Sequence, residues 1–133
     1  MIVADTMLMA YLVVQTPFSD ECERLRLVDP DWVAPRYVEV ELQNVLWQYL
    51  RRGDFTLEET LGRYETAVSF VRRVFDVSAE TAIRLAHAHD CSPYDTRFAA
   101  LADELGLPLL TYDSRLLERL PVAMSPAAFL ADR

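Results

Sequence analysis

Short apolar segments alternate with helical patterns along the chain, and this alternation most constrains the fold. The clearest helical pattern, residues 36–52, repeats apolar side chains at three- and four-residue spacing and stops at Gly53. Strands that alternate with helices build a parallel sheet with helices packed on its faces. The sequence therefore predicts an α/β domain with a central parallel sheet.

The full set of predicted elements follows the same rule. Five strands are expected, at residues 2–5, 32–34, 75–77, 108–111 and 122–124. Helices are expected at residues 6–15, 19–28, 36–52, 56 to about 73, 79–89, 94–105, 114–120 and from 125 onward. A length of 133 residues suits one compact domain, so we expect a single domain over residues 1–133.

Charge and composition exclude several classes of protein. The net charge of -8 and pI near 4.7 count against non-specific binding of nucleic acid. All 13 basic residues are Arg, and P-loop NTPases, receiver domains and haloacid-dehalogenase-type phosphatases each need a Lys. No apolar run is long enough for a membrane span, and Cys22 and Cys91 form no CxxC pattern. We expect a cytoplasmic protein with reduced thiols.

Three acids, Asp5, Asp95 and Asp113, occupy positions where this fold places ligand sites, and a fourth, Glu41, lies inside a predicted helix at the border of its apolar stripe. Asp5 ends the first predicted strand and Asp113 follows the fourth, and ligands bind at the carboxyl ends of parallel strands. Asp95 lies in the first turn of a predicted helix, and Glu41 shares a helical face with Asn44. Clustered carboxylates favour a hard divalent cation, Mg²⁺ or Mn²⁺ rather than Zn²⁺.

Each acid also has an ordinary structural interpretation. Asp5 and Asp113 are suitable N-caps for the helices that follow them. Asp95 is the acid at position N3 of a capping arrangement that begins at Ser92. Glu41 could be a solvated helix residue, and Glu39 borders the same apolar stripe from its other side. Sequence order gives no distances, so spacing alone leaves the choice open.

Four motifs, in order along the whole chain, resemble those of PIN-domain proteins, and most of all the small VapC-type toxin ribonucleases. The motifs are Asp5-Thr6, Pro35 with Glu41-Leu-Gln-Asn44, Cys91-Ser-Pro-Tyr-Asp95 with Phe98-Ala-Ala-Leu-Ala, and Leu110-Thr111-Tyr-Asp113. Glu41 is preferred over Glu39 because it precedes Asn44 by the family spacing. Met7 and Pro93 depart from the family pattern, and neither departure removes an acid.

The resemblance implies a three-layer α/β/α fold and a metal-dependent endoribonuclease that hydrolyses phosphodiester bonds of specific structured RNA. Asp5, Glu41, Asp95 and Asp113 would then hold Mg²⁺ or Mn²⁺ and carry catalysis. The expected partners are an RNA substrate, a VapB-like antitoxin that covers the site, and a second copy of the chain. The expected supporting residues are Thr6, Asn44 and Thr111 around the carboxylates, and Arg36, Arg97 and Arg115 for RNA phosphates.

Three other functions remain open at this point. A PIN nuclease could act in RNA processing outside a toxin–antitoxin module, and an adjacent short reading frame would argue against that. A binding module could keep the fold without chemistry, although the intact acids favour activity. A metal phosphatase would instead release phosphate from monoesters.

Overall fold

The computed structural model describes all 133 residues and contains one five-stranded sheet, which is parallel throughout. The strand order is β3-β2-β1-β4-β5, so the first strand lies in the middle, paired with β2 on one side and β4 on the other. The predicted α/β fold with a parallel sheet is therefore confirmed. The strands are β1 (Ile2–Ala4), β2 (Trp32–Pro35), β3 (Val71–Phe75), β4 (Leu109–Leu110) and β5 (Ala123–Met124).

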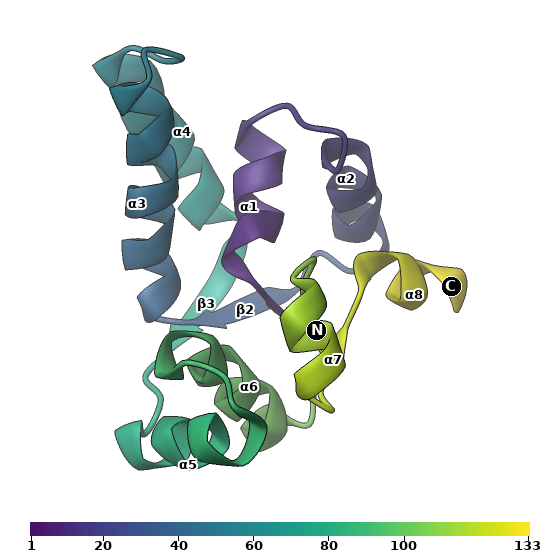
Figure 1. Ribbon diagram of the computed structural model, residues 1–133. Helices are drawn as coiled ribbons and strands as arrows, with labels where there is room; N and C mark the ends of the chain where they lie inside the picture. Colours follow the sequence, from purple (N-terminus) through teal and green to yellow (C-terminus); the bar gives the residue numbers. More distant parts are fainter.

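Eight helices cover the sheet. Helices α1 to α4 lie on one side of it and α5 and α6 on the other, while α3 and α4 extend away from the sheet as an antiparallel pair (Figure 1). The longest helix has 15 residues, and no helix is both long and apolar enough to cross a bilayer. The helices are α1 (Thr6–Val13), α2 (Ser19–Val28), α3 (Tyr37–Arg51), α4 (Leu57–Ser69), α5 (Ala79–His89), α6 (Pro93–Leu105), α7 (Ser114–Arg119) and α8 (Pro126–Ala131).

Local signals in the sequence account for most helix ends. Thr56 and Glu59 form the expected reciprocal capping box at the start of α4. Ser92 accepts a hydrogen bond from the Asp95 amide, and Pro93 occupies the first turn of α6. Gly106 ends α6 with a φ of 66°, a left-handed conformation that costs glycine little. These caps fix where the loops beside the sheet begin.

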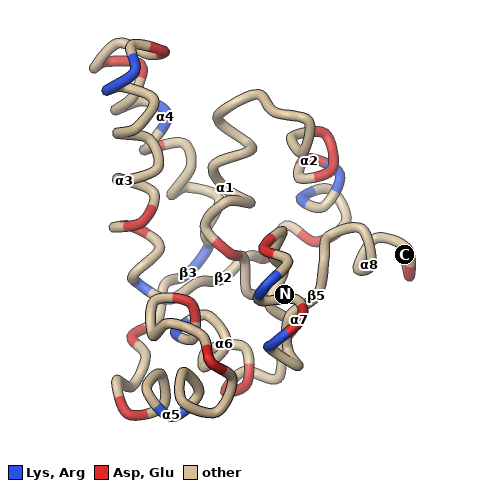
Figure 2. Tube along the Cα trace, in the orientation of Figure 1, with Lys and Arg blue, Asp and Glu red and all other residues tan.

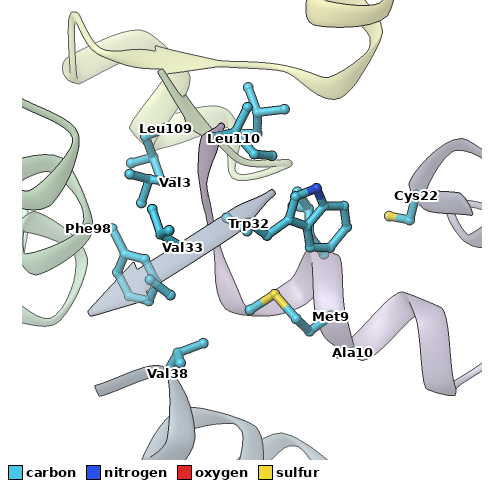
Figure 3. Packing of buried hydrophobic residues seen from close by; sticks show 14 of the residues in the cluster. Val3, Met9, Ala10, Cys22, Trp32, Val33, Val38, Phe98, Leu109 and Leu110 are labelled. Carbon is cyan, nitrogen blue, oxygen red and sulfur yellow. The ribbon is translucent and has the colours of Figure 1, made fainter. Parts of the chain in front are cut away.

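The core surrounds the central strands on both faces. Trp32 on β2 is fully buried on the side of α1 and α2, where Met9 and Cys22 lie, and its indole nitrogen donates to the Asp29 carbonyl at 2.7 Å. Phe98 from α6 packs on the opposite side, near Val33 (Figure 3). Burial on both faces explains why β1, β2 and β4 are continuous apolar runs. The buried strands β1 and β4 end shortly before Asp5 and Asp113, so the packing of the core positions these two acids.

The prediction was wrong at the third strand. The helix expected to reach about residue 73 ends at Ser69, and the strand covers Val71–Phe75 rather than residues 75–77. Pairing with β2 overrides the helical pattern that continues through Arg72 and Arg73. Both arginines are exposed on this edge strand, where charged side chains discourage pairing with another chain.

Candidate active site

All four predicted acids line one cleft of about 340 Å³. Asp5 follows β1 and Asp113 follows β4, while Glu41 comes from α3 and Asp95 from α6. The cleft therefore lies at the carboxyl ends of the central strands, as the fold predicts. A larger hollow of about 580 Å³ lies elsewhere, beside Met1, and it contains none of these four acids.

Asp5 is held by two threonines. Its Oδ1 accepts the Thr6 amide at 2.9 Å, and its Oδ2 accepts the Thr111 hydroxyl at 2.6 Å. The same Thr111 oxygen accepts the amide of Asp113 at 3.0 Å, so Thr111 links two of the acids. The pKa of Asp5 is raised to about 6, mainly by burial; the charges of Glu41 and Asp95 contribute to the increase, and the hydrogen bonds from Thr111 and Thr6 oppose it.

Glu41 faces the cleft, and Glu39 does not line it. The hydroxyl of Thr6 donates to Glu41 Oε1, which ties α3 to the start of α1. Burial raises the pKa of Glu41, the Thr6 hydrogen bond lowers it, and the charge of Asp95 raises it. Glu39 instead lies 3.8 Å from Arg36 in an ion pair. Asn44, one turn after Glu41, is exposed at the edge of the cleft.

Asp95 and Asp113 take part in helix capping as well as lining the cleft. Asp113 Oδ1 accepts the amides of Arg115 and Leu116 at 2.9 and 3.2 Å. Asp95 Oδ2 accepts the Ser92 hydroxyl at 3.3 Å and lies 3.2 Å from Arg115 Nη2. Burial raises the pKa of Asp95, while Ser92 and Arg115 lower it. Capping therefore does not remove either acid from the cleft.

The three predicted RNA-contacting arginines have different environments. Arg36 pairs with Asp76 at 2.9 Å, and Arg115 pairs with Asp95 inside the acidic cluster. Arg97 has no carboxylate partner and lies near the rings of two tyrosines. Figure 2 shows basic positions scattered among acidic ones, rather than gathered on one element. Among the three, Arg97 alone is free of an acidic partner.

Four residues that line the cleft were not predicted from the sequence as part of the site. Tyr11 and Tyr112 line the cleft together with Met7 and Val45. The two tyrosine rings meet edge to face at 5.6 Å, and the Tyr112 hydroxyl donates to Glu21 at 2.8 Å. Tyr112 stands between Thr111 and Asp113, so its place in the motif was a usable signal. The sequence held no such signal for Tyr11, because an apolar residue at helical spacing in α1 is expected to face the core.

The donor chemistry of the cleft fits Mg²⁺ or Mn²⁺, since all four acids offer oxygen only. Three of them are half-buried, and Arg115 is the one cation paired within the cluster. As the side chains stand, no group of three or more His, Cys, Asp or Glu residues is arranged to hold a metal ion. A cation bound to Asp95 Oδ2 would compete with Arg115, which already pairs with that oxygen.

The chain belongs to the PIN-domain family, because the family model of the PIN domain matches residues 2–122. Its acidic cleft lies within that match. The chain is also similar to a curated protein named Ribonuclease VapC3, from Pyrobaculum aerophilum. The two are 28% identical over 129 residues, which cover 94% of this chain and 98% of that protein.

Solved structures share the fold. The crystal structure of PAE2754 from Pyrobaculum aerophilum matches with a TM-score of 0.77 and 21% identity, covering 98% of this chain and 93% of that one. A toxin–antitoxin complex from Klebsiella pneumoniae matches with a TM-score of 0.73 and 17% identity, over 95% and 98% of the two chains. VapBC2 from Rickettsia felis, bound to a promoter DNA fragment, gives 0.66 and 16%, over 94% and 97%.

Proposed function

We propose that this protein is a metal-dependent endoribonuclease that acts as the toxin of a toxin–antitoxin module. The observation that carries the proposal is the meeting of four carboxylates, from four separate segments of a PIN domain, in one cleft. The relative named Ribonuclease VapC3 supports an activity on RNA. The site explains how an acidic protein could cut RNA, because a bound cation offsets the local negative charge.

The proposed ligands of Mg²⁺ or Mn²⁺ are Asp5, Glu41, Asp95 and Asp113. When bound, the ion would lower the pKa of water and stabilise charge on the phosphodiester as it is cleaved. Thr6 and Thr111 orient two carboxylates through the hydroxyl hydrogen bonds described above. Asn44 lines the same cleft, and its proposed role is to support the carboxylates.

The proposed partners follow from charge and from the relatives. Two structural neighbours are described as a toxin–antitoxin complex and as VapBC2, which supports a small VapB-like antitoxin. That antitoxin should present a basic or Arg-bearing segment to the acidic cleft. The net charge of -8 makes generic RNA affinity weak, so the protein should cut a few structured RNAs at single-stranded loops. A second copy of the chain is the remaining proposed partner.

Sequencing the 5′ ends of cellular RNAs after induced expression tests the proposal. Wild-type protein should create new ends at a small number of sites in loops, and Glu41→Gln should create almost none. Indiscriminate degradation would contradict the predicted selectivity. An absence of new ends in the wild type, with the protein folded and expressed, would contradict the nuclease itself.

The ion pair between Arg115 and Asp95 predicts competition with the metal. Arg115→Ala should strengthen Mn²⁺ binding by about two- to fivefold, the range expected for removing a partly exposed ion pair. Calorimetric titration measures the change directly. Arg36→Ala is the matched control, because its ion pairs with Asp76 and Glu39 lie outside the cleft. Equal or weaker binding by Arg115→Ala would show that Asp95 does not need to be released.

A further inference from the structure

A pair of stacked tyrosines lies beside the acids and has no part in the site as described so far. The rings of Tyr37 and Tyr94 are 5.3 Å apart at an angle of 23°. Tyr37 lies one helical turn before Glu41 on α3, and Tyr94 directly precedes Asp95 on α6. The pair therefore joins the two helices that supply two of the four acids.

The Tyr94 side chain is largely open to solvent. The residue is 59% exposed, whereas Tyr37 beneath it is half-buried. Stacking on Tyr37 occupies one face of Tyr94 and fixes its orientation. The remaining exposed surface is an aromatic platform on the residue directly before Asp95, which lines the cleft.

Arg97 adds a positive charge to this platform. Its guanidinium carbon lies 5.4 Å from the Tyr37 ring centroid and 6.0 Å from that of Tyr94. A hydrogen bond at 3.1 Å to the Pro93 carbonyl holds the side chain in place. Unlike Arg36 and Arg115, Arg97 pairs with no carboxylate, so its other donors remain available to an anion.

We propose that Tyr94 and Arg97 form a nucleotide-binding subsite, in which an unstacked base of single-stranded RNA stacks on Tyr94 and a neighbouring phosphate contacts Arg97. The inference rests on the proposed ribonuclease function and names where the substrate lies. Aromatic platforms beside cationic side chains bind single strands this way, because every base has a π face. A duplex keeps its bases stacked, so the subsite selects loops and ends.

The nearness of the acids favours RNA over a protein partner on this surface. A nucleotide stacked on Tyr94 would place the adjoining backbone next to Asp95 and Glu41, where cleavage is proposed. The chain offers a control of the same kind in Trp47. Trp47 is an exposed aromatic residue of α3, 49% accessible, and it lies in an apolar groove with Leu57 and Leu61 rather than beside the acids.

Binding of a short single-stranded RNA that carries a fluorescent aminopurine base tests the subsite, with chelator present to prevent cutting. Tyr94→Leu should weaken binding about tenfold and abolish the fluorescence change caused by stacking. Tyr94→Phe should retain both, since the ring is kept. Arg97→Ala should weaken binding and lower the salt slope by about 1. Trp47→Leu should behave as wild type.

The outcomes separate this inference from the proposed function. If wild type binds and cuts RNA but Tyr94→Leu matches it in affinity and fluorescence, the subsite is overturned and the nuclease stands. If Tyr94→Leu alters only self-association or binding of a protein partner, the surface serves a protein and the subsite is again overturned. A wild type that neither binds nor cuts RNA overturns both.

Discussion

Replacing Glu41 with glutamine should reduce RNA cleavage by more than about 100-fold. This loss is larger than the roughly 10- to 100-fold that usually follows when a residue that only hydrogen-bonds to a metal ligand is replaced. The amide keeps the shape of the side chain and can still accept the Thr6 hydroxyl, but it removes the negative charge that holds a cation. Initial rates of cleavage of one defined RNA, at saturating Mg²⁺, measure the effect.

Glu39→Gln is the matched control, because it makes the same chemical change on the same helix two residues away. Glu39 pairs with Arg36 at the surface and lines no part of the cleft, so this variant should cut RNA nearly as wild type does. The reverse pattern would mean that the wrong helix face carries the chemistry. Equal, mild losses in both variants would indicate that neither glutamate binds the metal.

Asp5→Asn should stabilise the metal-free protein at neutral and alkaline pH. The pKa of Asp5 in the folded protein is about 6, raised by burial from 3.8, so folding favours its protonated form. This contribution to stability is fully present below about pH 4 and is lost as pH rises through about 6. The neutral amide avoids that loss, which amounts to at most about 3 kcal/mol.

Denaturant unfolding in chelator, at about pH 4 and about pH 8, measures this difference. The variant should exceed wild type in stability at the higher pH and match it at the lower. Asp76→Asn is the control, since Asp76 is an exposed acid in a surface ion pair and should change stability little at either pH. If the variant is less stable than wild type at both pH values, burial of the ionised Asp5 does not destabilise the folded protein.

Most of the fold could be predicted from the sequence, because the local patterns of capping and apolar residues agree with the elements that the tertiary structure contains. Capping residues such as Thr56 and Ser92 place helix starts, and apolar runs place the buried strands. The edge strand β3 was misplaced because Arg72 and Arg73 extend a helical pattern that only pairing with β2 interrupts. Such pairing depends on a neighbour that lies about 40 residues away in sequence, and local patterns do not carry it.

Less of the candidate site could be predicted from the sequence. The predicted strand ends placed Asp5 and Asp113 where parallel sheets bind ligands, whereas the choice of Glu41 over Glu39 came from the family resemblance. The contact between Arg115 and Asp95 could not be predicted, because it depends on how α6 and α7 pack. The same holds for the stacking of Tyr94 on Tyr37, which joins residues of α3 and α6.

Titration of Mn²⁺ into wild type and Asp5→Asn tests the central claim most directly, with calorimetry and thermal melts on the same samples. Wild type should bind Mn²⁺ and melt at a higher temperature as the ion is added, because binding to the native state alone stabilises it. Asp5→Asn should lose most of both responses, although its metal-free form is the more stable one. An identical metal response in the two proteins, or none in wild type, would contradict a metal site built on these acids.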